Sequence, residues 1–402
     1  MNAMQPEHIP DNLVVDFDIY APPAQEGDFY SAWRKLQAPG TPDVVWTPHN
    51  GGHWIPTRAT VIAEVMSDYE LFSNRTILIP KIHGASHGLI PTTMDPPEHR
   101  PYRQLLNTAL APDRIAAVEQ AVNATATTLI EDVAEQGECD FIRDYSDKFP
   151  IRVFMTMMDL PQSEAEQTKY WCDQLLRPDG SMSFAEAMEK LFAYMEPYVL
   201  ARRDAPGIDL VSELVNGQIG EQRIDTEESM KLAVQVLIAG LDTVVNFLGF
   251  AMHFLATHPE EQQRLRENPA LIDNAVEELL RRFAVVTIGR EVTRDQVFHG
   301  APLRSGDMIA TPSPLAGIDE QETANAMTVD FNRGPQRHLT FGRGHHLCPG
   351  RNLARAEIRI TIQRWLAMVP EFHIPDAADI TFKGGIVAVL NALPLRWQNA
   401  KQ

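Results

Sequence analysis

The chain has 402 residues, a formal net charge of −19 and 44% apolar residues. This composition is typical of a folded globular protein and excludes wholesale disorder. The excess of acids argues against nucleic acid or an anionic membrane surface as the main partner, because both are negatively charged. The three cysteines, Cys139, Cys172 and Cys348, are too few and too widely spaced for a disulfide framework, and they fit a reducing cytoplasm.

The first part of the chain changes from short strands to helices. Residues 1–60 mix strand-like segments with turns, and a helix pattern follows for which Thr57 is the expected N-cap. Residues 74–97 form a loop rich in proline, glycine and histidine. From Arg103 to about Arg281 helical periodicity dominates.

The last part of the chain returns to strands. Residues 284–316 look extended, and residues 317–350 carry many turn residues without clear periodicity. A last amphipathic helix runs from about Asn352 to Met368, and short strands follow it. Strand-like segments at both ends of a helical middle predict one interleaved domain over residues 1–402.

One apolar segment, Leu232 to Ala256, is long enough to span a bilayer. It carries a single charged residue, Asp242, and a carboxylate in the middle of a lone membrane span is costly. We interpret the segment as a long helix buried in the core of a large soluble protein. Residues 1–18 contain no apolar signal core, so we expect a cytoplasmic protein. The alternative, a membrane-helix protein, rests on this segment alone.

Cys348 lies in a glycine-rich segment, FGRGHHLCPG, over residues 341–350. Glycines such as Gly342 and Gly344 allow unusual turns, so that backbone N–H groups can point at the sulfur. A helix follows, and its positive N-terminal end also favours a thiolate. Phe341 can pack beside the sulfur and shield it from water. These are the features that a thiolate ligand of haem iron needs.

This segment resembles the cysteine-ligand loop of the cytochrome P450 family. From about Asp16 to Trp397 the chain resembles the subfamily of the soluble bacterial camphor hydroxylase, with IPTTMDPPEHR, RPDGSMSFAEA, GLDTVVNFL and EELLRRF among the matching segments. The resemblance implies a mainly α fold with small β-sheets, the cytochrome P450 fold. It also implies haem b with Cys348 as the iron ligand, and insertion of one atom of O2 into an unactivated C–H bond.

Asp242 and Thr243 follow Gly240 in the long apolar segment. An acid followed by a threonine is costly to bury in an apolar core helix, so the pair indicates a site that contains water. The resemblance implies that Thr243 stabilises the iron hydroperoxide and that Asp242 delivers protons, while Gly240 leaves space where the helix passes the iron. It further implies that Lys169 and Arg177 hold Asp242.

Haem carries two propionates, which need cations. The resemblance assigns to them four residues, His99, Arg103, Arg290 and His346. His99 and Arg103 lie four apart just after a proline pair that can start a helix, so they are expected to share a face. His345 has no assigned role.

Glu278 and Arg281 lie three apart on a predicted helix, and such a pair is ordinarily a solvated ion pair. The resemblance implies instead that both are buried and that, with Arg333, they hold the segment before the Cys348 loop.

The resemblance also implies a substrate site. Its residues are Leu78, His87, Leu89, Leu176, Gln235, Ile238, Ala239, Val286, Ile386 and Val387. His87 stands where the camphor enzyme has a tyrosine that donates to the ketone, and Gln235 stands where it has a leucine that faces the substrate. Such departures argue against camphor and favour another small terpenoid or norisoprenoid. Ala85 replaces a glutamate of the camphor enzyme's potassium loop near Gly84. Whether a cation site persists there is therefore an open question.

The electron donor is inferred from charge. Residues 333–359 contain six arginines and a single acid, Glu357, in a strongly acidic protein. This basic window surrounds the Cys348 loop and would attract an acidic [2Fe–2S] ferredoxin. Two other functions remain open: a haem-thiolate binding or sensor protein without oxygenase activity, and a peroxide-using variant. Asp242 and Thr243 argue against both, because neither function needs that pair.

Overall fold

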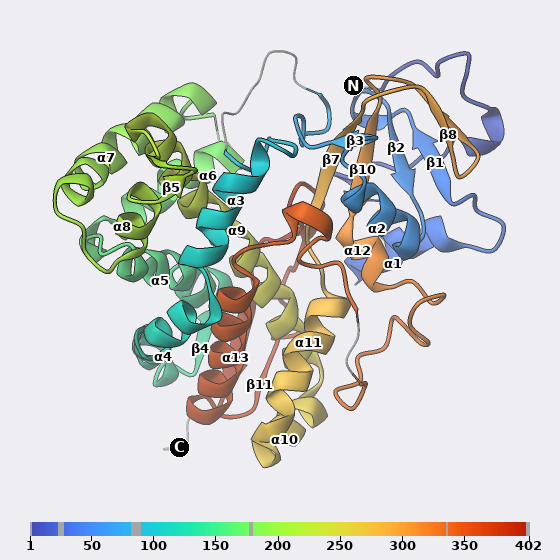
Figure 1. The fold of residues 1–402 in the computed structure, drawn as a ribbon. Helices are drawn as coiled ribbons and strands as arrows, with labels where there is room; N and C mark the ends of the chain where they lie inside the picture. Colours follow the sequence, from blue (N-terminus) through green and yellow to red (C-terminus); the bar gives the residue numbers. More distant parts are fainter. Residues whose placement is uncertain (1, 23–27, 82–89, 177–179, 335–336, 399–402) are drawn as a thin grey trace.

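The computed structural model describes residues 2–22, 28–81, 90–176, 180–334 and 337–398. Most of them are helical (Figure 1). The α-helices are α1 (Phe29–Arg34), α2 (Ala59–Ser67), α3 (His99–Ala109), α4 (Pro112–Ala134), α5 (Phe149–Met157), α6 (Ala165–Leu176), α7 (Phe184–Asp204), α8 (Leu210–Val215), α9 (Thr226–Thr257), α10 (Pro259–Glu267), α11 (Ile272–Arg282), α12 (Ser313–Gly317) and α13 (Arg351–Met368).

The strands form small sheets, as the resemblance implied. The largest has the order β1 (Val44–Thr47), β2 (His53–Pro56), β10 (Met308–Pro312), β7 (Thr287–Val292) and β3 (Phe72–Ser73). A second sheet has the order β11 (Phe372–His373), β14 (Pro394–Trp397) and β4 (Glu138–Asp140). Two-stranded sheets pair β5 (Gln218–Ile219) with β6 (Gln222–Arg223), β8 (Gln296–Phe298) with β9 (Ala301–Leu303), and β12 (Phe382–Lys383) with β13 (Val389–Leu390). The fold is therefore mainly α with small β-sheets.

Helix α9 runs through the middle of the helical part and contacts α5, α6, α7, α8, α10 and α13 (Figure 1). It starts where the Asp225 side chain accepts a hydrogen bond from the N–H of Glu228 at 2.7 Å, a typical N-cap. Among the described residues, α9 is the one helix long and apolar enough to cross a membrane. Since 83% of its apolar window is buried inside the protein, it is a core helix, as interpreted from the sequence.

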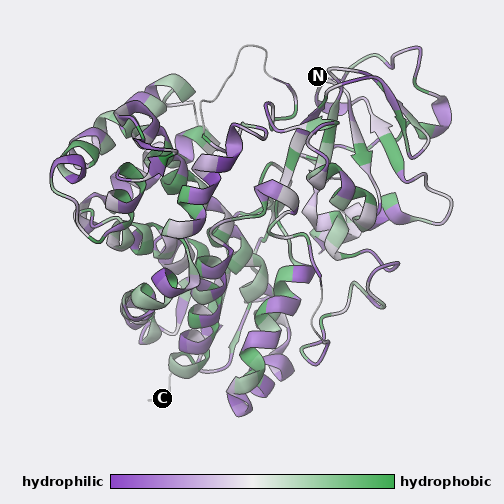
Figure 2. Ribbon diagram, viewed as in Figure 1, coloured by the Kyte–Doolittle hydropathy of each residue, from purple (hydrophilic) through white to green (hydrophobic). Residues whose placement is uncertain are grey.

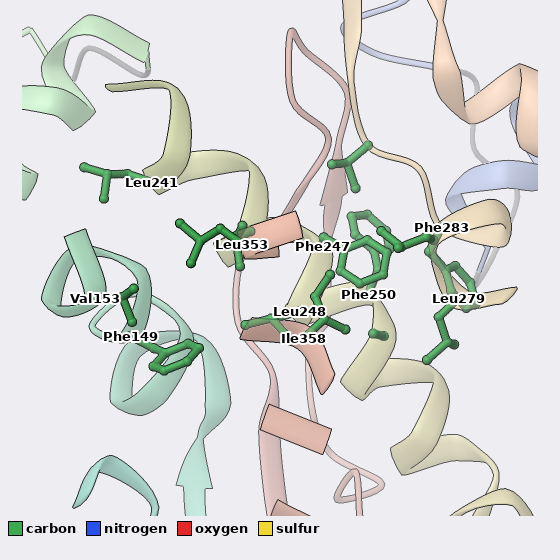
Figure 3. Close-up of a cluster of buried hydrophobic side chains, with 14 of the residues drawn as sticks. Phe149, Val153, Leu241, Phe247, Leu248, Phe250, Leu279, Phe283, Leu353 and Ile358 are labelled. Atoms are coloured by element: carbon green, nitrogen blue, oxygen red, sulfur yellow. The ribbon is translucent and has the colours of Figure 1, made fainter. Parts of the chain in front are cut away.

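The main core is built where α9 meets three other helices. Figure 3 shows Phe149 and Val153 of α5, Leu241, Phe247, Leu248 and Phe250 of α9, Leu279 of α11 with Phe283 just after it, and Leu353 and Ile358 of α13. The apolar residues lie on inward helix faces, whereas hydrophilic residues are frequent on the outside (Figure 2). A smaller cluster, which includes Trp46, Trp54 and Phe72, packs around the five-stranded sheet.

The predicted last helix begins one residue early, at Arg351. The expected cap of α2 is wrong. Thr57 is buried and donates to the carbonyl of Pro42 at 2.8 Å, while Arg58 occupies the N-cap position and its side chain makes no capping hydrogen bond to the helix. The N–H of Ala59 instead donates to Oδ2 of Asp319 at 2.8 Å. The cap therefore comes from a residue 260 positions away.

Candidate functional site

The Cys348 loop is a tight turn closed by its own backbone. The N–H of Cys348 donates to the carbonyl of Phe341 at 2.8 Å. Gly342 and Gly344 both have φ of +73°, and a Cβ on Gly344 would lie 3.0 Å from the carbonyl oxygen of Met66. The glycines are required by conformation and by close packing against the end of α2. Helix α13 begins directly afterwards, with Gly350 as its N-cap, so the sulfur lies at a helix N-terminus.

The surroundings of Cys348 combine burial with positive charge. Burial raises the pKa of the Cys348 thiol, and the N–H of Gly350 and the cations Arg103, Arg351 and Arg355 oppose that increase. These groups would stabilise a thiolate bound to a metal ion. Phe341 lies under the Arg355 guanidinium, whose carbon is 4.7 Å from the ring centroid.

The other two cysteines are buried, with acids nearby. Cys139 and Cys172 are buried, and burial is the main cause that raises the pKa of both thiols. The pKa of Cys139 is raised to about 12. Burial and the neighbouring acids therefore keep both thiols protonated.

Imidazoles and cations gather beside the Cys348 loop. The His99 ring of α3 lies 4.3 Å from the His346 ring and 5.9 Å from the His345 ring, measured between centroids. The Arg103 guanidinium donates to the carbonyl of Leu347 and so connects α3 to the loop. Buried Arg290 of β7 is close enough to lower the pKa values of His345 and His346. The four predicted propionate ligands are thus brought together, and His345 joins them.

Buried nitrogens of this cluster are unpaired, although the charge of Asp95 acts on His99, His345 and Arg290. Among the described residues, neither ring nitrogen of buried His99 has a hydrogen-bond partner, and nor does Nε of Arg290. Burial is the main reason why the pKa of His99 is lowered to about 4 and that of His346 to about 2. Neighbouring cations and imidazoles lower both pKa values further. Burial also lowers the pKa of Arg290 to about 10. A ligand with carboxylates would satisfy these buried groups.

One face of α9 is open in the middle of the helix, where the neighbouring residues are buried. Ala239 is exposed and Thr243 is half-buried, while Ile238, Leu241 and Asp242 are buried. Thr243 Oγ1 lies 3.5 Å from the carbonyl of Ala239. The helix therefore borders an opening at the point where the acid and the threonine follow each other.

The carboxylate of Asp242 is held from the next turn of α9. Nδ2 of Asn246 donates to Oδ1 of Asp242 at 2.9 Å and to its backbone carbonyl at 2.7 Å. Asp242 is thereby fixed beside the open face while the side chain itself is buried.

A family model for cytochrome P450 matches residues 169–368. The probable cytochrome P450 127A1 of Sinorhizobium fredii is 34% identical and covers 98% of this chain and 96% of its own length. The steroid C26-monooxygenase of Mycolicibacterium smegmatis is 30% identical over 93% of this chain and 92% of its own. The chain belongs to the cytochrome P450 family. The crystal structure of CYP101J2, from the camphor hydroxylase subfamily, has a TM-score of 0.93 at 38% identity and covers 99% of this chain and 100% of that one.

The family fixes the reaction class and the cofactor. This P450 is a monooxygenase with a haem-thiolate cofactor. The unpartnered buried nitrogens of His99 and Arg290 fit the two propionates, and the arginines around Cys348 fit a thiolate ligand.

The buried Glu278 network of this P450 is confirmed. Arg281 donates to both oxygens of Glu278, at 2.9 and 2.8 Å, and both side chains are 2% exposed. Nε of Arg333 donates to Oε1 of Glu278 at 3.0 Å. Arg281 also donates to the carbonyls of Gly317 and Ala326, at 2.5 and 2.7 Å. The network therefore holds irregular chain that leads to the Cys348 loop.

Two interpretations around α9 need correction. A Cβ on Gly240 would clash with the ring of Phe154 of α5, so this glycine makes room for helix packing and not for the iron. Lys169 pairs with Asp173 at 2.6 Å and with Asp147 at 3.3 Å, so the expected contact with Asp242 is wrong for this side chain. Arg177, the other expected partner, lies outside the described residues.

The predicted substrate residues fall into two groups. Gln235, Ile238 and Ala239 lie on α9. Val286 and Val387 pair across an isolated bridge, and the N–H of Thr287 donates to the carbonyl of Ile386 at 2.8 Å. The half-buried members are Leu78, Val286, Ile386 and Val387. His87 and Leu89 lie outside the described residues, as do Gly84 and Ala85, and so does the side chain of Leu176.

The basic window around Cys348 is less charged than its sequence suggests. Acids from other helices pair with three of its arginines: Arg355 with Glu277 at 2.5 Å, Arg359 with Glu119 at 2.7 Å, and Arg333 with Glu278 at 3.0 Å. Glu357, the one acid of the window, is buried, and burial raises its pKa well above the usual value. Counting charges along the sequence missed these acids because they come from α4 and α11.

A cationic surface nevertheless remains beside the Cys348 loop. A pocket of about 480 Å³ is lined by α3, the loop and the start of α13, with Arg100, Arg103 and Arg351 among its residues. Arg343 of the loop is exposed. In the part of the chain that the structure describes, Arg100, Arg343 and Arg351 have no carboxylate within ion-pair distance. We call this surface the Cys348 face.

Proposed function

We propose that this P450 hydroxylates an unactivated C–H bond of a small hydrophobic terpenoid or norisoprenoid, with electrons from a [2Fe–2S] ferredoxin. The observation that carries the proposal is the placement of Cys348. Its sulfur precedes the N-terminus of α13 and lies among Arg103, Arg351 and Arg355, which is the environment that a thiolate ligand needs.

Bound haem supplies the redox chemistry, in which one atom of O2 enters the substrate and the other leaves as water. Cys348 is the proposed iron ligand, and Phe341 limits access of water to its sulfur. His99, Arg103, Arg290 and His346 would hold the propionates of haem b.

Protons for the reaction would arrive along the open face of α9. The Thr243 hydroxyl can donate and accept a hydrogen bond at the reaction site. Asp242, kept in place by Asn246, would pass protons to it from the protein interior. A haem-thiolate sensor has no need of this pair, which favours the oxygenase over that alternative.

The substrate class follows from the lining and from the relatives. Ile238, Ala239, Val286, Ile386 and Val387 offer apolar surface for a hydrocarbon skeleton, with Leu78 beside them in the proposed site. The relative from Mycolicibacterium acts on a steroid, as its name says. The identity to CYP101J2 is higher, and the camphor hydroxylase subfamily to which that structure belongs supports a smaller substrate for this chain.

The remaining proposals concern the cell and the partner. We infer a cytoplasmic protein of one domain, because α9 is buried and one core cluster contains residues from Phe17 to Trp397. An acidic ferredoxin would dock on the Cys348 face, since attraction by Arg100, Arg343 and Arg351 complements its charge.

The haem-thiolate assignment is tested by one spectrum. The reduced, CO-bound protein is expected to have the red-shifted Soret band that thiolate donation causes. Cys348→Ser should abolish this band, whereas Cys139→Ser should keep it. An unshifted band in folded wild-type protein would contradict the role of Cys348.

A substrate panel tests the proposed class. Ligands that displace water from the haem change its spectrum, so affinities can be compared for β-ionone, camphor and a steroid. We expect β-ionone to bind most tightly. Tighter binding of the steroid would contradict the proposal of a small substrate.

A further inference from the structure

Arg355 of α13 lies against the Cys348 loop. Its guanidinium carbon is 4.7 Å from the centroid of the Phe341 ring, within the range of a cation–π contact. The N–H of Cys348 donates to the carbonyl of Phe341, so this ring belongs to the turn that presents the sulfur. Burial raises the pKa of the Cys348 thiol, and the charge of Arg355 is among the groups that oppose this increase. Arg355 is thus a cation that acts on the sulfur.

Glu277 of α11 holds the Arg355 guanidinium in place. Nε and Nη2 of Arg355 donate to the two carboxylate oxygens of Glu277 at 2.5 and 3.0 Å, which makes the pair bidentate. Nε2 of His338, whose side chain is 4% exposed, lies 3.4 Å from Oε2 of Glu277. Burial alone would raise the pKa of Glu277, but the contacts with His338 and Arg355 outweigh it and lower the pKa to about 2. The carboxylate is therefore charged near neutral pH, and both of its oxygens are engaged.

We propose that Glu277 is a positioning residue that sets the reduction potential of the haem through Arg355. The inference rests on the proposed function, because it takes Cys348 as the iron ligand. Reduction transfers one electron from the ferredoxin to ferric iron, so the iron–thiolate centre becomes more negative by one charge. A nearby cation favours the reduced form, whereas a nearby anion favours the oxidised form.

The two charges of the pair therefore act in opposite directions on the potential. Arg355 contacts the Phe341 ring and raises the potential, while Glu277 fixes the guanidinium there and offsets part of its charge. The potential of the haem would follow from the balance between them, in the same way that other groups around a metal ligand tune the metal.

Potentiometric titration of the holoenzyme with dithionite and mediators measures this balance. Arg355→Leu removes the cation and should lower the midpoint potential, with a roughly tenfold change in the reduction equilibrium, or about 59 mV for one electron. Glu277→Gln keeps an oxygen that can accept from Arg355 but removes the negative charge, so it should raise the potential. A merely structural pair would not give shifts of opposite sign, because both substitutions weaken the same contact.

The pair of Arg359 and Glu119 is the matched control on the same helix. Nη2 of Arg359 donates to Oε1 of Glu119 at 2.7 Å. Arg359 lies four residues beyond Arg355, about 6 Å farther along the axis of α13 from the Cys348 loop. Arg359→Leu and Glu119→Gln make the same changes in net charge and should leave the potential close to that of the wild type. If they shift it as much as the substitutions of Arg355 and Glu277, net charge is responsible and the inference is wrong.

The CO-bound spectrum separates this inference from its premise. A normal CO band, with potentials of the Arg355 and Glu277 variants that are unmoved or shifted in the same direction, would reject the inference alone. An unshifted band in the wild type would reject the proposed function. Arg355→Gln replaces the leucine variant if that protein retains no haem, and it should also lower the potential.

Discussion

Thr243 and Asp242 are neighbours in the sequence, yet their surroundings differ. Asp242 is buried and bonded to Asn246, whereas Thr243 is half-buried with a long contact to the carbonyl of Ala239. The threonine hydroxyl is therefore free to turn toward a ligand, while the acid is held behind it. This division fits a proton relay in which the outer group contacts the reaction site and the inner group supplies the proton.

Replacing Thr243→Ala should divert most electrons to hydrogen peroxide, because the hydroxyl that positions a proton is lost. Haem content and substrate affinity should stay unchanged. The ratio of hydroxylated product to consumed reductant, together with released peroxide, measures this effect. Thr243→Ser keeps a hydroxyl and should retain most of the coupling. Fully coupled product formation in the alanine variant would refute the role given to Thr243.

A second residue, His53 of β2, links stability to pH. Burial lowers its pKa from 6.5 to about 4, and the hydrogen bond to the carbonyl of His49 only partly offsets this. The unfolded chain binds a proton below pH 6.5, whereas the folded protein does not until about pH 4. The neutral side chain thus favours folding above pH 6.5, and this contribution is lost as the pH falls.

The expected loss from His53 is about 3 kcal/mol in the free energy of unfolding between pH 6.5 and 4. His53→Asn keeps a donor near the His49 carbonyl but does not titrate, so its stability should fall less over this range. Urea unfolding of both proteins across the pH series measures the difference. Parallel curves for the two proteins would exclude a titrating His53.

Local sequence patterns predicted the helices and the Cys348 loop, but they could not predict contacts between residues far apart in the chain. The glycines of the Cys348 loop, the helix after it and the core helix α9 follow from spacing and composition alone. The cap of α2 could not be predicted, because Asp319 reaches it from another part of the chain. Gly240 was misinterpreted for the same reason, since its missing Cβ makes room for Phe154 of α5.

Helix α11 offers a matched pair of neighbouring acids. Glu278 is buried with Arg281 and Arg333, while the side chain of Glu277 is 38% exposed and pairs with Arg355. Glu278→Gln leaves a buried guanidinium without its charge partner and should lower the free energy of unfolding by about 3–5 kcal/mol. Glu277→Gln should lower it by less, by about 1 kcal/mol, because this pair is partly exposed to solvent.

Denaturant unfolding and haem retention measure the contrast between these two variants. Since the Glu278 network holds the segment that leads to the Cys348 loop, Glu278→Gln should also release haem more easily. Equal destabilisation by the two substitutions would contradict the proposed difference between the buried network and the partly exposed pair.

At the scale of the whole molecule, charge is distributed more subtly than its sum suggests. A net charge of −19 coexists with a cationic surface at Arg100, Arg343 and Arg351, and the sequence located this surface but overestimated it. The error has a physical origin: acids of α4 and α11 fold against arginines of α13, and only the tertiary structure brings them together.

Charge reversal of exposed Arg343→Glu should therefore slow association with an acidic [2Fe–2S] ferredoxin roughly tenfold at low salt, with a smaller effect at high salt. Stopped-flow reduction of the ferric protein at increasing ferredoxin concentration measures the rate. Arg396→Glu is the control, because it makes the same change in net charge on β14, where Arg396 pairs with Glu138. An unchanged CO band in both variants verifies that the haem site is intact. If both substitutions slow the reaction equally, net charge and not the Cys348 face attracts the ferredoxin, and the proposed docking surface is wrong.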